Sequence, residues 1–360
     1  MLEKSWKDKV STPALIIDYD VMKGNIETMA KFAKDNNLSL RPHVKTHKCP
    51  VIGKMQLEAG ADGICVARVG EAEIFAENGF TDILIANEVI ELNQIKRLIE
   101  LNKKSLVRIC VDSKKNIQDL NKYASKNKIT LEVLLEIDIG LGRNGVKPGE
   151  EALNLAKIIK DHNYLKLVGL QGYEGHLVSV TDPDLRKKQS EDCMKKLIDT
   201  RNLLNQNGYD IKYLTVGNTV TYKYSGKVKG ITELQPGTYI FNDWHYCQTS
   251  PEFNLAATVL GTITNNPGKR FYTLDAGLKA ITSDSGYPII RSYPKCKIKV
   301  MTEEHSIFRA GPEDSFEIGQ KLEIFPSHIC TTVNLYDFLT VIKDNEIIAK
   351  WEILARGKNY

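Results

Sequence analysis

The sequence predicts a (β/α)8 barrel followed by a smaller, mostly β domain. Between about residues 20 and 245, short apolar runs alternate with segments whose apolar residues recur every three or four positions. After about residue 250 the helical periodicity stops and strand-like runs remain. Apolar strands separated by helices are typical of a parallel barrel, with an open doubly wound sheet as the rival fold.

The barrel strands are expected at eight runs: 38–44, 63–67, 82–86, 106–111, 131–138, 165–173, 213–217 and 238–241. Helices are expected between them; the first is indicated by Met22, Ile26, Met29 and Ala33, at spacings of three and four. These alternations predict a barrel domain over residues 20–247.

The C-terminal domain, residues 248–360, is expected to be built from strands at 255–263, 271–274, 295–301, 321–325, 338–342 and 347–354. The segment Lys343-Asp344-Asn345-Glu346 predicts a hairpin turn between the last two. The run 14–18 precedes the first helix, so residues 1–19 are expected to supply an additional strand to this β domain.

Composition argues against several classes of function. The chain has 360 residues, of which 42% are hydrophobic and 26% charged, as in ordinary globular proteins. Its net charge is +4 and its basic residues are scattered, which indicates neither nucleic-acid binding nor a membrane partner. Seven irregularly spaced cysteines and the lack of a membrane-length apolar stretch favour a reducing, cytoplasmic location. A small-molecule substrate is therefore expected.

Lys45 lies in the run Arg41-Pro42-His43-Val44-Lys45-Thr46-His47-Lys48, at the end of the first expected strand. Crowded like charges disfavour the ammonium form, so such a lysine can become a neutral amine that forms an imine. On charge pattern alone, a solvated basic turn or an anion-binding patch is the favoured interpretation.

Polar residues follow six of the expected strands, at the barrel mouth where chemistry collects. They are Lys45, Arg68, Asn87, 138–145, 174–176 and 217–219. The turn Gly217-Asn218-Thr219 follows the seventh strand, where barrels often bind phosphate, although a plain turn explains it equally well. The ring of polar strand ends predicts an active site at this mouth.

The blocks 41–48, 138–145, 172–176, 215–218 and 236–239 together resemble the pyridoxal-phosphate (PLP) enzymes of the alanine-racemase-like fold. Within that group the chain resembles the D-serine dehydratase and D-threonine aldolase branch, from about Ser11 to near the C-terminus. The resemblance implies that Lys45 holds the cofactor as an imine, that Arg143 contacts its phenolic oxygen and that Tyr173 lies near its pyridine nitrogen. It places four further residues around the phosphate: Thr215, Gly217, Asn218 and Tyr239.

His328 and Cys330 form the second distinctive element, in Pro326-Ser327-His328-Ile329-Cys330. Imidazole and thiolate are good zinc ligands, and residues two apart on an extended segment point the same way. Spacing alone favours a buried thiol beside a structural histidine. The resemblance implies a metal site instead, because the dehydratase branch carries the same His-X-Cys pair. Zinc is expected from the thiolate, with manganese or another divalent ion as the alternative.

The resemblance implies a D-serine dehydratase that removes the β-hydroxyl of a small D-amino acid with a metal as Lewis acid, giving pyruvate and ammonia. D-threonine aldolase is the alternative, but its pattern favours His-X-Asp, so Cys330 favours the dehydratase. An amino-acid racemase and a non-enzymatic PLP-binding protein are less favoured; the latter lacks a C-terminal β domain. The resemblance also implies a homodimer.

Overall fold

The computed structural model describes residues 5–360, which form two compact units. The barrel unit comprises Met29–Lys45, Ile52–Gly237 and Gly357–Tyr360. The β unit comprises 5–28, Thr46–Val51 and Thr238–Arg356. Across residues 5–360, none of the helices is both long enough and apolar enough to span a membrane.

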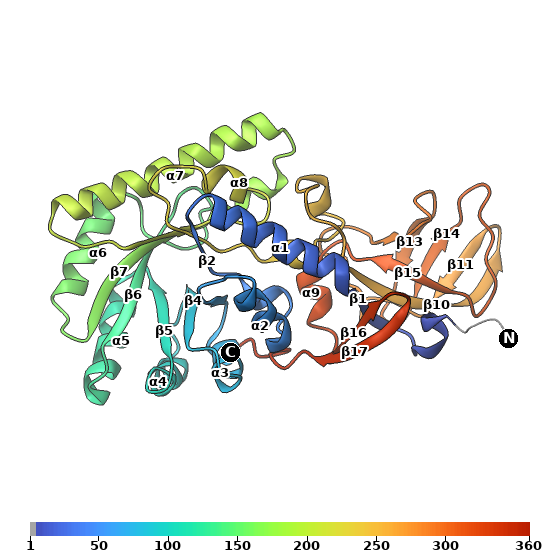
Figure 1. The fold of residues 1–360 in the computed structure, drawn as a ribbon, viewed down its shortest axis with the longest axis horizontal. Coiled ribbons are helices and arrows are strands. Elements are labelled where there is room, and N and C mark those ends of the chain that lie inside the picture. The colour runs from blue at the N-terminus through green and yellow to red at the C-terminus, as the bar shows by residue number, and fades with distance from the viewer. Residues whose placement is uncertain (1–4) are drawn as a thin grey trace. The chain divides into compact units, whose positions relative to one another are not determined.

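The barrel unit contains a curled sheet of eight parallel strands in the order β2-β9-β8-β7-β6-β5-β4-β3 (Figure 1). A parallel bridge between His43, just after β2, and Cys65 in β3 joins the two edges of the sheet. The predicted β/α barrel is therefore confirmed. Its strands are β2 (Ser39–Leu40), β3 (Ile64–Val66), β4 (Asp82–Glu88), β5 (Leu106–Val111), β6 (Leu131–Ile137), β7 (Leu165–Gly172), β8 (Tyr213–Val216) and β9 (Glu233–Leu234).

Helices connect successive strands, and several begin at residues suited to the task. Ser113 and Asp182 accept hydrogen bonds from backbone amides of the first turns of α5 and α7, and Pro183 is the first residue of α7. The helices up to residue 225 are α1 (Tyr19–Asp35), α2 (Pro50–Glu58), α3 (Val69–Glu77), α4 (Leu92–Leu101), α5 (Lys114–Asn127), α6 (Glu150–Lys160), α7 (Pro183–Gln206) and α8 (Tyr222–Ser225).

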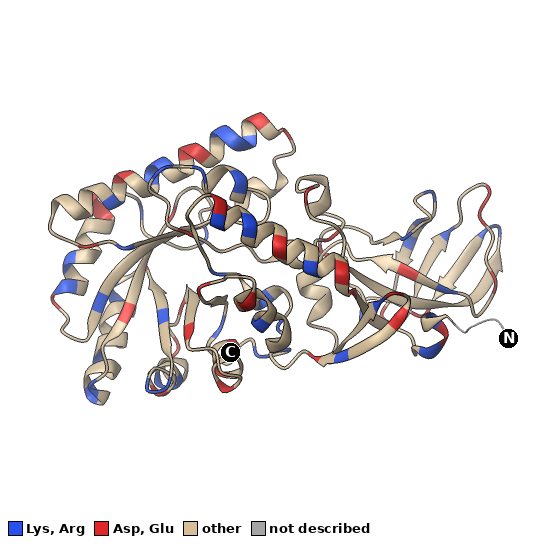
Figure 2. Ribbon diagram, in the orientation of Figure 1, with Lys and Arg blue, Asp and Glu red and all other residues tan. Residues whose placement is uncertain are grey.

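The lysine-rich stretch of α7 is a solvated face rather than a basic stripe. Figure 2 shows acidic and basic residues interspersed along this helix, and Lys195 pairs with Asp199 one turn further on, at 3.2 Å. Such exposed pairs contribute little free energy, but they leave no continuous positive surface along the helix.

The eighth barrel strand differs from the prediction. It is β9 (Glu233–Leu234), whereas the predicted run 238–241 begins with a 3-10 turn, Thr238–Ile240. The strand ends at Leu234: Pro236 has no amide hydrogen to donate, although its carbonyl accepts a hydrogen bond from the His43 amide at 2.9 Å, and Gly237 weakens extended structure. The apolar side chains that suggested a strand are buried around the turn instead.

The barrel interior changes character along the strands. Its middle is an apolar cluster with one residue from each of β3 to β7: Cys65, Leu84, Cys110, Leu134 and Val168. Ion pairs close the amino ends: the Arg41 guanidinium contacts Glu233 at 2.9 Å and Asp82 at 2.7 Å, and Arg108 also contacts Asp82 at 2.7 Å. Because apolar side chains fill the middle of the barrel and ion pairs fill its amino end, the carboxyl ends of the strands are where a polar site can be open to ligands.

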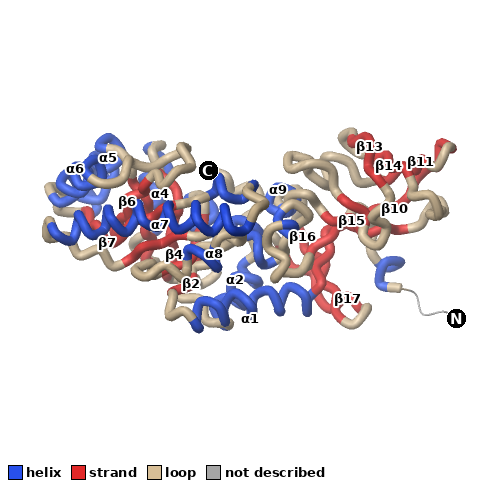
Figure 3. The backbone as a smooth tube through the Cα atoms, turned by 90° about the horizontal axis from the view of Figure 1, so that it is seen from above, coloured by secondary structure: helices blue, strands red, loops and turns tan. Residues whose placement is uncertain are grey.

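The β unit contains a nine-stranded sheet with the main order β13-β14-β11-β10-β1-β16-β17, and β15 joins β10 to β12. Strands β13, β14 and β11 lie side by side at one edge (Figure 3). The strands are β1 (Ala14–Asp18), β10 (Ala257–Gly268), β11 (Phe271–Leu274), β12 (Ile289–Ile290), β13 (Lys297–Met301), β14 (Ser306–Arg309), β15 (Lys321–Phe325), β16 (Phe338–Lys343) and β17 (Glu346–Glu352). The short strands β12 and β14 were not predicted.

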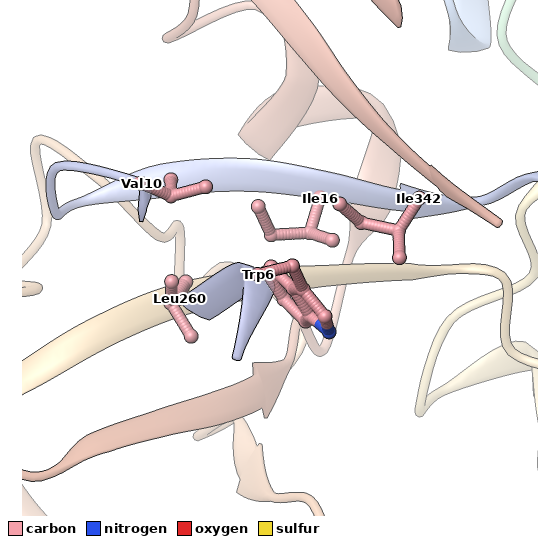
Figure 4. Packing of buried hydrophobic residues seen from close by; sticks show 5 residues of the cluster. All are labelled: Trp6, Val10, Ile16, Leu260 and Ile342. Carbon is pink, nitrogen blue, oxygen red and sulfur yellow. The ribbon is translucent and has the colours of Figure 1, made fainter. Parts of the chain in front are cut away.

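Strand β1 lies between β10 and β16, antiparallel to the former and parallel to the latter. Its Ile16 packs with Leu260, Ile342 and the side chains of Trp6 and Val10 (Figure 4). The segment before the first helix therefore contributes both a strand and part of the core of this unit.

The predicted hairpin turn between β16 and β17 is present. Asp344 and Asn345 have φ angles of 48° and 62°, the left-handed region that a two-residue type I′ turn requires. Asp and Asn tolerate this region better than most residues, so local sequence was sufficient to locate the turn.

Candidate active site

Lys45 lines a cavity at the carboxyl ends of the barrel strands. After β2 the chain forms the His43 bridge and then a 3-10 turn, Val44–Thr46, which carries the lysine. The lining comprises His43, Lys45, Ala86, Arg143, Gln171, Gly172, Tyr173, Val216, Gly217 and Gln235. Four residues that the sequence singled out are therefore brought together here: Lys45, Arg143, Tyr173 and Gly217.

Arg41 does not add to the positive charge at Lys45 as the sequence suggested. Its buried guanidinium is held by Glu233 and Asp82 at the amino ends of the strands. Two carboxylates compensate its charge, so Arg41 contributes little net positive charge near Lys45.

Arg143 and Tyr173 lie next to each other in the cavity lining. The Arg143 guanidinium lies over the Tyr173 ring, 5.4 Å from its centroid. Arg143 belongs to the loop that follows β6, where Asp138 Oδ1 accepts hydrogen bonds from the amides of Gly140 and Gly142, each at 3.0 Å. These bonds fold the loop back on itself and lower the pKa of Asp138, although partial burial opposes that shift.

Hydrogen bonds join two residues of the cavity lining, Gln171 and Gln235, to Thr215 and Glu136, which are absent from the lining. Gln235 Nε2 donates to Gln171 Oε1 at 3.0 Å and to Thr215 Oγ1 at 2.6 Å, and Gln171 Nε2 donates to Glu136 Oε2 at 2.6 Å. Glu136, Gln171 and Gln235 were not predicted from the sequence. A signal was present for Glu136, which interrupts the otherwise apolar run Leu134-Leu135-Glu136-Ile137.

Gly217 begins a turn that is fixed by buried side chains. Its φ is +91°, and a Cβ there would lie 3.0 Å from Leu234 Cδ2, so the turn requires glycine. Asn218 Oδ1 accepts hydrogen bonds from the amides of Val220 and Thr221, at 2.8 and 3.2 Å. The predicted Asn218 therefore shapes the turn with its side chain.

Buried Glu174 supports the same turn. Its carboxylate accepts a hydrogen bond from Thr221 Oγ1 at 2.7 Å and from the Gly217 amide at 3.4 Å. Burial raises the pKa of Glu174 despite these hydrogen bonds. Of the residues predicted near a phosphate, Gly217 lines the cavity, whereas Thr215, Asn218 and Tyr239 are absent from its lining. Tyr239 is buried in the β unit, against Phe253.

His328 and Cys330 lie at the start of the short helix α9 (Ile329–Val333) in the β unit, not on a strand. Asp243 Oδ2 accepts the Ile329 amide hydrogen bond at 3.0 Å and so fixes this helix start. Burial raises the pKa of Asp243. Thr46, the residue after Lys45, has its Oγ1 3.3 Å from Cys330 Sγ.

The Asp284 carboxylate contacts Nδ1 of His328 and so fixes the orientation of the imidazole ring. Burial opposes the charged imidazole, but interaction with Cys330 and Asp284 outweighs it and raises the pKa of His328 to about 10. A carboxylate on one ring nitrogen is the usual support for a metal-binding histidine. Within residues 5–360, no group of three or more His, Cys, Asp and Glu side chains is arranged to hold a metal ion.

Known protein families match both units. The N-terminal domain of alanine racemase matches residues 17–243, more than half of the chain. The chain belongs to this alanine-racemase-like family. A putative serine dehydratase domain matches residues 256–342.

Among the relatives, D-threonine aldolase of Arthrobacter sp. is 33% identical over 97% of this chain and 93% of its own length. D-serine dehydratase of Dictyostelium discoideum is 25% identical over 95% of this chain and 96% of its own. Membership of this group confirms the prediction of a PLP-dependent lyase.

Solved structures of similar enzymes match the entire fold. D-threonine aldolase from Filomicrobium marinum superimposes with a TM-score of 0.94 at 34% identity, covering 98% of this chain and 96% of its own. D-threo-3-hydroxyaspartate dehydratase from Delftia sp. HT23 gives a TM-score of 0.90 at 25% identity, covering 97% and 99%. The family thus contains both aldolases and dehydratases.

Proposed function

We propose that this protein is a PLP- and metal-dependent lyase of β-hydroxy D-amino acids, with D-serine dehydratase activity. The observation that carries the proposal is the meeting of Lys45 with Arg143, Tyr173 and the glycine turn at Gly217 in one barrel-mouth cavity. These groups suit a phosphorylated aldehyde cofactor: the amine can form an imine with the aldehyde, the guanidinium can bind an anionic oxygen, and the aromatic ring can pack against the cofactor ring. The glycine turn lets backbone amides approach the phosphate.

Each residue of the cavity has a role in this proposal. Lys45 would hold PLP covalently through its amine and, once released by the substrate amine, would take the proton from Cα. Arg143 would bind the phenolic oxygen, while the turn at Gly217 would receive the phosphate. PLP, when bound, supplies the electron sink that makes loss of the α-proton feasible.

His328 and Cys330 would hold the metal. A bound divalent ion supplies Lewis acidity toward the β-hydroxyl, a poor leaving group without it. Two similar solved structures are variants of a D-threo-3-hydroxyaspartate dehydratase in which a histidine, or a cysteine two positions further on, is replaced by alanine, and the cysteine variant is in the metal-free form. The same two residue types at the same spacing occur here, and the thiolate favours zinc over manganese or magnesium.

D-threonine aldolase is the second candidate. Overall similarity favours it, because the chain is 33% identical to the Arthrobacter aldolase and 26% identical to the Delftia dehydratase. We nevertheless prefer the dehydratase, because Cys330 offers a soft thiolate ligand. The dehydratase whose cysteine variant is in the metal-free form has a cysteine of the same kind. We also propose that the protein is a homodimer and that it is located in the cytoplasm. The seven free cysteines agree with a cytoplasmic location, because thiols stay reduced there.

A product assay tests the proposal. Purified protein, supplied with PLP and zinc, is incubated with D-serine, D-threonine and a 3-hydroxy-D-aspartate, with and without chelator, and products are identified by mass. Pyruvate from D-serine that disappears with chelator supports the dehydratase. Glycine and acetaldehyde from D-threonine, without pyruvate from D-serine, would establish the aldolase. No product from any of these substrates would reject the lyase proposal.

Variants separate the two candidate sites. Lys45→Ala and Cys330→Ala are each expected to abolish pyruvate formation. Matched controls are Lys166→Ala, whose amine instead pairs with Glu132 at 3.2 Å, and Cys296→Ala, whose thiol contacts Asp314. Both controls are expected to retain activity. Equal loss in a control and its test variant would contradict the assignment of that site.

A further inference from the structure

Three consecutive loop residues meet three carboxylates from neighbouring barrel strands. Asn144 Nδ2 donates to Glu88 at the end of β4. The Gly145 amide donates to Asp112 Oδ2, just after β5, at 3.1 Å. Arg143 Nη2 faces Glu136 Oε1 of β6 across 4.0 Å. The contacts of Asn144 and Gly145 are hydrogen bonds, whereas the distance between Arg143 and Glu136 is too long for one.

The Arg143 side chain is free to move relative to Glu136, because no hydrogen bond joins the two, whereas Glu136 is held in place. The Arg143 side chain is 53% exposed, whereas that of Glu136 is 5% exposed. Gln171 holds Glu136 Oε2 at 2.6 Å, so Oε1 is the oxygen presented to the guanidinium. The loop itself is anchored by its next two residues, so Arg143 can change partner without loop opening.

The charges around Glu136 decide which partner Arg143 takes. Burial raises the pKa of Glu136 to about 8, and the carboxylates Glu88 and Asp112 add to the shift while Arg143 opposes it. The titratable groups facing it are thus Glu88 on β4, Asp112 after β5 and Arg143 on the loop. Lys45 lines the cavity together with Arg143. Near neutral pH Glu136 keeps its proton and attracts the guanidinium only weakly.

We propose that Glu136 is a positioning residue that competes with the cofactor for Arg143. As a neutral acid it leaves the guanidinium to an anionic oxygen in the cavity; as a carboxylate it draws the guanidinium away. This inference rests on the proposed function, because it requires that the cavity takes PLP. It is separate from the roles assigned above, in which Glu136 had no part.

The test is the dissociation constant of PLP, measured by titration of the apoprotein between about pH 6.5 and 9.5. Glu136→Gln keeps the size of the side chain and an oxygen for Gln171 but cannot ionise. We expect it to match the wild type at low pH and to bind PLP about fivefold more tightly above about pH 8, the scale of a half-exposed ion pair.

Two further variants show whether the effect acts through Arg143. Glu132→Gln removes a carboxylate from the same strand, where it pairs with Arg108 at 2.9 Å, and is expected to follow the wild-type pH profile. In an Arg143→Met background, Glu136→Gln is expected to change nothing. A purely structural role of Glu136 would instead weaken binding at every pH and persist without Arg143.

The outcomes separate this inference from the proposed function. Failure of the wild type to bind PLP at any pH would reject the proposed function and this inference with it. Binding by the wild type with the same pH profile in Glu136→Gln would overturn the inference alone. So would a gain in affinity that survives the loss of Arg143.

Discussion

Replacing Gly145 by alanine should disable the Arg143 loop without touching any side chain of the cavity. Gly145 has a φ of +100°, and a Cβ there would lie 2.6 Å from the Asp138 amide nitrogen and 2.9 Å from the Ile137 carbonyl carbon. Both are backbone atoms that a rotamer change cannot move. Relief requires breaking the clasp at the loop base, where Asp138 and Val146 are joined by a 2.9 Å hydrogen bond.

The expected magnitude follows from this geometry. Positive φ alone costs an L-residue about 1–2 kcal/mol, and loss of one or two backbone hydrogen bonds adds about 1 kcal/mol each. Gly142→Ala is the matched control, because φ there is +67° and nothing lies within 4 Å of the added Cβ. It should cost only the conformational term, about 1 kcal/mol.

PLP titration and thermal unfolding of the apoprotein measure the two consequences. Gly145→Ala should weaken PLP binding at least about tenfold, equivalent to about 1.4 kcal/mol, because Arg143 moves with its loop. Gly142→Ala should weaken it less than about threefold. Equal effects of the two substitutions, or wild-type affinity in Gly145→Ala with a lowered melting temperature, would refute the link between this clasp and the cofactor site.

Three other predictions concern the barrel base, a buried acid and the metal pair. Arg41→Met leaves buried Glu233 uncompensated and should lower the unfolding free energy by about 3–5 kcal/mol, while Arg41→Met with Glu233→Met should restore most of it in denaturant unfolding. Because the pKa of Glu136 rises from 4.5 unfolded to about 8 folded, its contribution to apoprotein stability is fully present below 4.5 and is lost as pH rises to about 8. Melting temperatures should fall less over this range in Glu136→Gln, and parallel curves would contradict the raised pKa. Asp284→Asn withdraws the carboxylate from His328 and should weaken zinc binding about 10–100-fold in competition with a chelator, whereas unchanged affinity would contradict a supporting role of Asp284 at the metal site.

Local sequence and one rule of fold were sufficient to place Lys45, Arg143 and Gly217, because all three follow barrel strands and parallel strands bring such positions to the same mouth. Tyr173 was expected at the site only from the family resemblance. The C-terminal hairpin was equally predictable, because the turn chemistry of Asp344 and Asn345 is local.

The rest depends on pairing that local sequence does not encode. Whether Gln171 lies beside Glu136 is set by the register of β6 and β7, which shifts between Val133 and Leu134. Strand β9 has only two residues, Glu233 and Leu234, too few for a periodic signal.

The central claim is that Lys45 carries PLP. The most direct measurement is borohydride reduction of the PLP-loaded protein followed by peptide mass mapping, with Lys48→Ala and Lys45→Ala as paired variants. We expect a visible absorption band before reduction and a phosphopyridoxyl group on Lys45, retained in Lys48→Ala and lost in Lys45→Ala. No band, or a stable adduct on a different lysine, would contradict the claim.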